Sequence, residues 1–215
     1  MYLPKSFEVT DPIKLAEVMN RFSFATLITT TGGVPFATHL PVLHRPRPGT
    51  TGILVGHVAR ANPQWQHFAN QTESLAIFSG PHAYVSPSWY EADLAVPTWN
   101  YIAVHAYGVP RVIEDEAWLE TLLDEMVQRY ESNRSQPWPN QLPEDFRRNL
   151  LKSIVGFEMP ITRIEGKFKL SQNRPEQDQA NVVCELSGSV NPDAAAVAEW
   201  MRAEGIGVGT NSPRP

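Results

Sequence analysis

The stretch Ile53–Trp65 constrains the fold of this chain more than any other part of its sequence. It opens with an apolar run that ends at Val58, which predicts a buried strand. Asn62 then offers a side-chain oxygen for a helix N-cap, and Pro63 suits a first helical position, which needs no N–H donor. Because free N–H groups at a helix start attract anions, Arg60 beside them is a candidate partner for a phosphate. A surface carboxylate is the alternative partner of Arg60.

The composition excludes several classes of protein. The chain has 215 residues, of which 42% are hydrophobic, so it can bury a sizeable core. No apolar run reaches the length of a membrane span, and the N-terminus lacks the pattern of a signal peptide. The net charge of −5 gives no general attraction to nucleic acid or to an anionic membrane. The single cysteine, Cys184, is typical of a reducing compartment, so we expect a cytoplasmic protein.

The pattern along the chain predicts a mainly β fold with flanking helices. Gly32-Gly33 indicates a hairpin, and Pro35 and Pro41 place its second strand at an edge or a bulge. The predicted strands are Phe24–Thr30, the segment from Val34 onward, Ile53–Val58, Leu75–Phe78, Tyr101–Tyr107 and Phe157–Ile161, the last ending before Gly166. The predicted helices are Pro12–Phe22, Pro63–Asn70, Glu114–Glu131, Pro143–Ile154 and Asn191–Ala203. Strands at this spacing favour a β barrel decorated by helices over repeated βαβ units.

Two further segments carry polar groups that a plain barrel does not need. The segment VPTWNY, residues 96–101, places hydrogen-bonding groups beside aromatic surface, which suits either a planar polar ligand or an ordinary interface loop. In GKFKLSQN, residues 166–173, Lys167 and Lys169 lie two apart and face the same side of a strand. They fit an anion, although solvated lysines on an edge strand are the commoner case.

Other familiar signals do not occur in this sequence. The six histidines have no paired metal-ligand spacing, so we expect no metal site. No GxSxG, Walker or GxGxxG pattern is present, and no helix pair has a basic second member that would suit a helix-turn-helix.

Four segments in order carry a resemblance to a known family: FATLITTTGGVPFATHLPVL, GHVARANPQW, VPTWNYIAVHAYG and IVGFEMPITRIEGKFKLSQNRP. Together they resemble the PaiB-type FMN-binding negative transcriptional regulators. These belong to the flavin-binding split-barrel group, which includes pyridoxamine 5′-phosphate oxidases and heme-degrading proteins. The resemblance implies a six-stranded FMN-binding split β-barrel, and a homodimer with FMN between its subunits. Residues 1–190 would form this domain, and residues 191–215 would add a helix and a loose tail packing on it.

The resemblance also implies which residues contact FMN. The strand of residues 36–40 would pass the flavin, and the corner after the third strand would hold the phosphate and ribityl chain, with Arg60 as the main charge partner. The implied cofactor-binding residues are Ala37, Thr38, His39, Leu40, His57, Arg60, Asn62, Thr98, Trp99, Asn100, Lys167, Lys169 and Gln172. The oxidases carry a further Arg and Lys on the strand aligned with residues 38–43. This chain has neither, so we do not expect their substrate.

The function implied by the resemblance is negative transcriptional regulation through flavin binding or redox state. The alternatives are an FMN-dependent oxidoreductase of the flavin reductase or oxidase type, and a heme-binding or heme-degrading relative. Direct DNA binding is doubtful because the chain is acidic and has no evident recognition helix. No side-chain pair demands an acid–base role, so the catalytic residues stay unknown, with His39 and His57 the nearest candidates.

Overall fold

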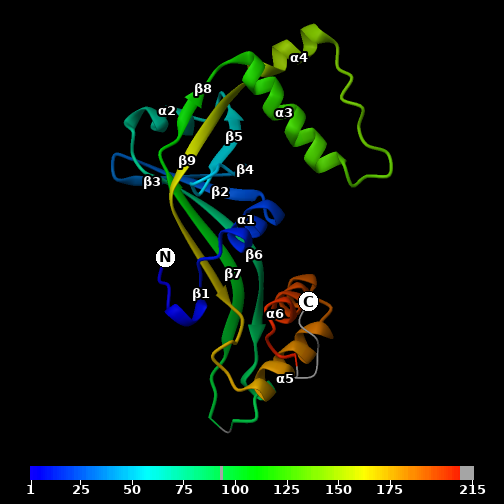
Figure 1. Cartoon of the computed structure of the whole chain (residues 1–215). Helices are drawn as coiled ribbons and strands as arrows, with labels where there is room; N and C mark the ends of the chain where they lie inside the picture. Colours follow the sequence, from blue (N-terminus) through cyan, green and yellow to red (C-terminus); the bar gives the residue numbers. More distant parts are fainter. Residues whose placement is uncertain (93, 209–215) are drawn as a thin grey trace. The chain divides into compact units, whose positions relative to one another are not determined.

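The computed structural model describes residues 1–92 and 94–208, and its contacts divide the chain into two compact units (Figure 1). Unit 1 contains Met1–Leu15, Ser79–Val104 and the described residues from Glu165 on, and unit 2 contains Ala16–Phe78 and His105–Ile164. The predicted tail beyond residue 208 lies outside the described residues. Within the described ranges, none of the helices has both the length and the apolar character that a membrane crossing requires.

Nine strands are present among the described residues: β1 Glu8–Val9, β2 Phe24–Thr31, β3 Val34–Pro41, β4 Leu43–Arg45, β5 Ile53–Ala59, β6 Ser74–Val85, β7 Thr98–Gly108, β8 Arg111–Ile113 and β9 Ile154–Lys169. The α-helices are α1 Pro12–Arg21, α2 Gln64–His67, α3 Glu116–Glu131, α4 Glu144–Leu151, α5 Glu176–Ser187 and α6 Pro192–Ala203. Three 3₁₀ turns, η1 Lys5–Phe7, η2 Phe68–Asn70 and η3 Pro87–Trp89, complete the described elements.

The strands form one sheet in the order β3-β2-β6-β7-β9-β5-β4, with β1 and β8 both paired with β9. The pairs β2–β3, β2–β6, β4–β5, β5–β9, β1–β9 and β8–β9 are antiparallel. The predicted mainly β fold with flanking helices is confirmed. The sheet has nine strands among the described residues where the resemblance implies six, and six of the nine have seven or more residues. The edge position predicted for the strand with Pro35 and Pro41 is also confirmed.

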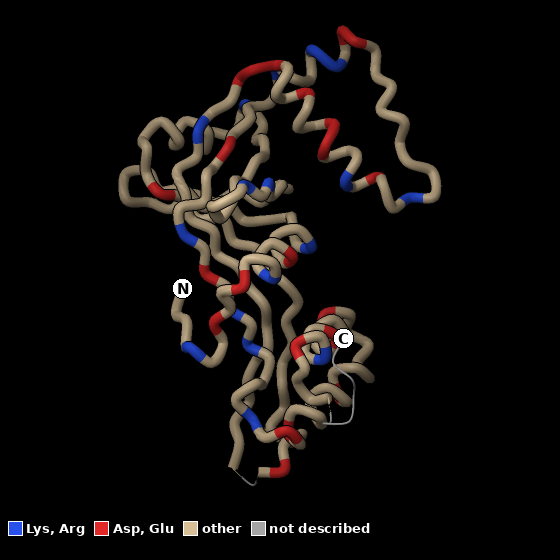
Figure 2. Tube along the Cα trace, viewed as in Figure 1, with Lys and Arg blue, Asp and Glu red and all other residues tan. Residues whose placement is uncertain are grey.

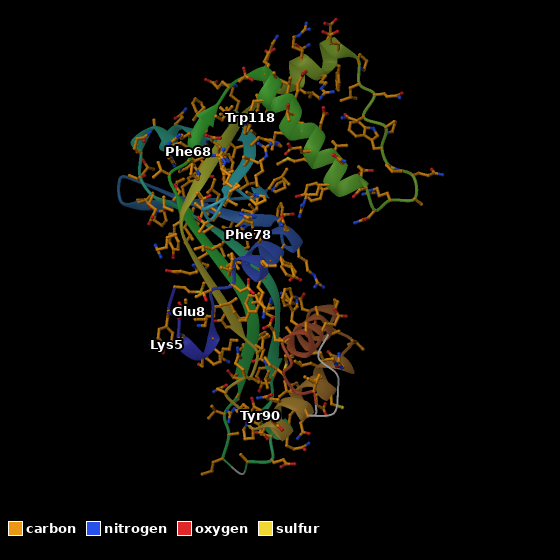
Figure 3. The ribbon with its side chains drawn as sticks, viewed as in Figure 1. Lys5, Glu8, Phe68, Phe78, Tyr90 and Trp118 are labelled. Carbon is orange, nitrogen blue, oxygen red and sulfur yellow. The ribbon has the colours of Figure 1, made fainter. Side chains whose placement is uncertain are left out.

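Unit 2 holds the hairpin and a buried hydrophobic cluster. Gly32 and Gly33 have φ angles of +56° and +78°, as the tight turn between β2 and β3 requires. Helix α3 packs on β4 and β5 through a cluster that Trp118 adjoins; its members are Leu43, Ile53, Val55, Leu122 and Met126. Asp115 caps α3 by accepting a bond of 2.7 Å from the Trp118 N–H. The labelled side chains of Phe68, Phe78 and Trp118 in Figure 3 belong to this unit.

Unit 1 pairs the N-terminal segment with the end of β9. Glu8 lies opposite Lys167 and Val9 opposite Gly166, so β1 extends the sheet there. Helices α5 and α6 lie side by side (Figure 1), and Phe168 of β9 packs edge-on against Trp200 of α6. The N-terminus of α6 begins at the predicted place, with Asn191 accepting from the Asp193 N–H at 3.0 Å.

Several predicted elements differ from those of the structure. The fourth strand does not stop at Phe78 but continues to Val85, and the last strand continues through Gly166 to Lys169. Residues 43–45 form strand β4, which the sequence did not predict as a separate element, because they pair with β5. The helix predicted over residues 63–70 is one α-turn of four residues followed by a 3₁₀ turn.

Candidate functional site

The corner between β5 and α2 in unit 2 has the local geometry that its sequence predicts. Asn62 Oδ1 accepts a bond of 3.0 Å from the Gln64 N–H, which is the expected N-cap contact. The Asn62 N–H in turn donates to Ala59 O at 2.9 Å and closes the turn. Because α2 has only four residues, its dipole adds little attraction for an anion. Any anion at this corner must be held mainly by side chains.

Two of the predicted segments meet at this corner. Asn62 Nδ2 donates to Thr38 Oγ1 at 2.9 Å, which joins the corner to strand β3 across 24 residues of sequence. On the same strand His39 is exposed, and its Nδ1 lies 2.9 Å from Thr26 Oγ1. Ala37 is exposed as well, whereas the side chain of Leu40 is buried in the core. The structure therefore brings Thr38 and Asn62 into contact. Because the side chain of Leu40 is buried, only the backbone of Leu40 could contact a ligand.

The guanidinium group of Arg60 is held in one orientation by three bonds within unit 2. Its Nε donates to Lys152 O at 2.9 Å, Nη2 donates to Ile154 O at 3.1 Å, and Nη1 donates to Glu114 Oε1 at 2.8 Å. The sequence left two partners open for Arg60, a phosphate and a surface carboxylate. In this structure the carboxylate of Glu114 is its partner. One N–H on each terminal nitrogen still has no acceptor among the described residues, so Arg60 keeps two donors that a phosphate could use.

His57 lies on β5, opposite Gly156 of β9. Burial lowers the pKa of its imidazole below the ordinary value, so His57 is neutral at pH 7. Its Nδ1 is buried and has no hydrogen-bond partner among the described residues. A neutral imidazole with an open ring nitrogen is suited to a hydrogen bond with a ligand or with water.

A polar network centred on the buried side chain of Gln64 lies behind the corner, and the sequence did not predict it. Gln64 is 0% exposed, and its amide Nε2 lies within bonding distance of Leu27 O at 2.9 Å, Phe36 O at 3.2 Å and Thr29 Oγ1 at 3.2 Å. Thr29 Oγ1 also lies 2.9 Å from His67 Nδ1. Gln64 thereby ties α2 to β2 and β3. In the sequence, the only local sign of this network is Gln64 itself, two residues after the capping residue Asn62.

In unit 1, Trp99 and Lys169 combine aromatic surface with positive charge. Trp99 is 53% exposed and has the rings of His82 and Tyr84 at centroid distances of 6.0 Å. Lys169 Nζ donates to Thr98 Oγ1 and to Trp99 O, both at 2.6 Å. An apolar cavity of about 320 Å³ lies beside Trp99, along β6 and β7.

Glu8 lies opposite Lys167 in the β1–β9 pair, but among the described residues no carboxylate forms a salt bridge with either lysine of β9. Lys167 is only 7% exposed, and its Nζ donates to Tyr2 O at 3.0 Å. Burial, followed by the charges of Lys167 and Arg174, lowers the pKa of the Lys169 ammonium below its ordinary value. No described carboxylate pairs with any of the three cations. This local excess of positive charge suits an anionic ligand better than solvent.

The other two predicted residues of unit 1 serve the protein's own packing. Asn100 is fully buried, and its Nδ2 donates to Ser171 Oγ at 2.9 Å. Gln172 Oε1 accepts from the Leu170 N–H at 2.7 Å, and its Nε2 donates to Phe168 O. Gln172 therefore braces the turn that follows β9, in which Ser171 has a φ of +65°.

Comparison with known proteins identifies the family. Residues 1–163 match the sequence model of the family described as "Putative FMN-binding domain". The chain is 41% identical over 203 residues to "Protease synthase and sporulation protein PAI 2" of Bacillus subtilis (strain 168), a match that covers 94% of this chain and 96% of that protein.

Solved structures share the fold at low sequence identity. The flavocytochrome Anf3 from Azotobacter vinelandii superimposes with a TM-score of 0.59 and 16% identity, covering 75% of this chain and 69% of that one. The FAD and heme binding protein from Mycobacterium smegmatis gives 0.56 and 17%, covering 75% and 73%. The long matches to the family model and to the Bacillus protein show that this chain belongs to the PaiB-type family of FMN-binding domains.

Proposed function

We propose that the chain is an FMN-binding protein that holds the phosphate of FMN at the Arg60 corner of unit 2. The observation that carries this proposal is the fixed guanidinium with one open N–H on each terminal nitrogen. Glu114 competes for the charge of Arg60, but its side chain is 58% exposed, and an exposed ion pair is a weak competitor. Thr38, linked to Asn62, places a hydroxyl group beside this corner for the ribityl chain.

The donor set of unit 1 fits a planar, anionic cofactor as well. Trp99 offers an exposed aromatic face, and Lys167 and Lys169 supply positive charge without described carboxylate partners. The family resemblance implies that this group also contacts FMN, and we propose that it does. When bound, FMN supplies hydride and electron transfer, while the protein supplies position and electrostatics. The Nδ1 of His57 can donate or accept one hydrogen bond, according to the tautomer.

The proposal predicts that two substitutions at the corner change FMN affinity in opposite directions. Arg60→Ala should weaken FMN about ten- to hundredfold and leave riboflavin nearly unchanged, because only FMN carries the phosphate. Glu114→Gln should tighten FMN and not riboflavin, because it removes the carboxylate that competes for Arg60. Quenching of flavin fluorescence on binding measures both dissociation constants.

A matched pair in the same unit gives the control. Arg148 and Glu144 of α4 form an exposed ion pair of the same type, so Arg148→Ala and Glu144→Gln should leave both affinities unchanged. Equal losses for FMN and riboflavin in Arg60→Ala would show that Arg60 supports the corner without contacting the phosphate.

The Lys169→Met variant tests the unit 1 group in the same assay. An unchanged affinity for both flavins would show that Lys169 does not belong to the site.

The exposed aromatic residues of unit 1 support a homodimer. Trp99 and Tyr84 are 53% and 46% exposed and contact each other, and large apolar groups exposed together commonly mark an interface. Sedimentation equilibrium should therefore give twice the chain mass of 24.1 kDa at micromolar concentration. A monomer loaded with FMN would contradict this assignment.

A regulatory role is the biological function that we propose. It is supported by the name of the Bacillus relative, which refers to protease synthesis and sporulation. We propose that regulation acts through flavin binding or redox state and not through tight contact with DNA. The net charge is −5, and Figure 2 shows Lys and Arg interspersed with Asp and Glu along the elements. Phosphate neutralisation by clustered cations supplies most non-specific affinity for DNA.

A further inference from the structure

A cavity of about 380 Å³ lies in unit 2 between strand β8 and the short turns α2 and η2, which lie next to β8 in Figure 1. Trp65, Gln66 and Phe68 line it from these turns, and Arg111 lines it from β8. This volume falls within the usual range for small-molecule sites. None of the residues expected to bind FMN is among the described residues that line it.

Both walls of this cavity connect to Arg60. On one wall, Trp65 Nε1 donates to the backbone oxygen of Arg60 at 3.0 Å, so the indole group lies against the corner. On the other wall, Arg111 lies three residues before Glu114, the ion-pair partner of Arg60, which is about 10 Å along an extended chain. The cavity therefore adjoins the place to which we assign the phosphate of FMN.

The lining combines an aromatic ring, amides and a positive charge. Trp65 is half-buried, and every nucleic acid base can stack on such a ring. Gln66 and Gln71 are exposed, and their amides can donate to and accept from the edge of a base. Arg111 lies opposite Glu158 in the β8–β9 pair, but among the described residues no carboxylate forms an ion pair with it. Its guanidinium group can therefore bind a phosphate.

We propose that this cavity binds an adenosine 5′-phosphate group, with the base on Trp65 and the phosphate at Arg111. The inference rests on the proposed function, because it places this group beside the phosphate held by Arg60. Two adjacent phosphates, each with its own arginine, match the pyrophosphate of FAD. A free adenine nucleotide bound beside FMN presents the same groups. The protein thus accepts FAD, or it takes up a second nucleotide next to its flavin.

Isothermal titration calorimetry with FAD and with FMN tests the first source. If the adenosine 5′-phosphate group belongs to the cofactor, FAD should bind at least tenfold more tightly than FMN. Trp65→Leu and Arg111→Gln should then each lower the ratio of the two affinities about tenfold, because one removes the stacking surface and the other a charge-assisted bond. The ratio is the correct measure, because losing the bond from Trp65 to Arg60 changes the corner for both flavins alike.

Titration of the FMN-saturated protein with AMP and with adenosine tests the second source. AMP should bind, and adenosine should bind at least tenfold more weakly, because it has no phosphate for Arg111. Trp65→Leu and Arg111→Gln should each weaken AMP about tenfold. Trp138→Leu and Arg148→Gln are the matched controls in the same unit. Their side chains are partly exposed and are not among the described residues that line the cavity, so both affinities should stay unchanged.

The two titrations decide the proposal together. Tighter binding of FAD, or binding of AMP, supports it when the variants at Trp65 and Arg111 remove the effect and the controls do not. FAD that binds no more tightly than FMN, together with no binding of AMP, would overturn it and leave the FMN corner standing. Equal effects of the control variants would overturn it as well. If neither flavin binds, the proposed function itself fails, and this inference fails with it.

Discussion

Replacing Gln64 by alanine should lower the free energy of unfolding by about 2–4 kcal/mol. The amide of Gln64 is the donor that faces the carbonyl oxygens of Leu27 on β2 and Phe36 on β3, and the residue is fully buried. Removing this donor leaves buried carbonyl groups with a lost hydrogen bond, and a buried acceptor without a partner is costly. Urea denaturation measures the change as a lower midpoint with an unchanged m-value.

Gln66 provides a matched control for this prediction. It is the same residue type on the same turn of α2 but is exposed, so Gln66→Ala should change stability by less than about 0.5 kcal/mol. Gln64→Met separates hydrogen bonding from packing, because methionine nearly preserves the volume but cannot donate. We expect Gln64→Met to lose most of what Gln64→Ala loses. Recovery of full stability in Gln64→Met would mean that volume, and not the hydrogen bonds, explains the effect.

The features that the sequence predicts well are local ones. Asn62, Asp115 and Asn191 each cap a helix by bonding a backbone N–H two or three residues further on. The Gly32-Gly33 turn likewise depends only on the φ angles of its own residues. Such contacts form within one turn of chain, so the residue types and their spacing are enough to predict them.

The features that the sequence does not predict depend on distant partners. Polar Gln64 is buried only because carbonyl groups 28 and 37 residues away accept its hydrogens. Strand β6 continues past Phe78 although it contains Pro81, because a proline can remain in a strand wherever its position needs no N–H donor. The ion pair of Arg60 depends on Glu114, which lies 54 residues further along the chain. The two members of each pair are too far apart in the sequence for a local pattern to predict their contact.

Gly166 shows the same dependence on distant residues, and its replacement should have a large effect. A Cβ atom at this position would lie 2.2 Å from Leu15 Cδ2 and 2.8 Å from the backbone oxygen of Val9. Glycine is therefore what allows β1 to pair so closely with β9, and it does not end the strand as its residue type suggested. We expect Gly166→Ala to lower the free energy of unfolding by about 2–3 kcal/mol, because the added atom overpacks a buried contact.

Gly188 is the control in the same unit, because the nearest atoms to its added Cβ would lie 3.8 Å away, at ordinary contact distance. Gly188→Ala should therefore leave stability unchanged or raise it slightly, since alanine restricts the unfolded chain. Combining Gly166→Ala with Leu15→Ala should cost less than the sum of the two single losses, because the second change removes one of the clashing groups. Strict additivity would show that the backbone contact with Val9, and not the Leu15 side chain, accounts for the strain.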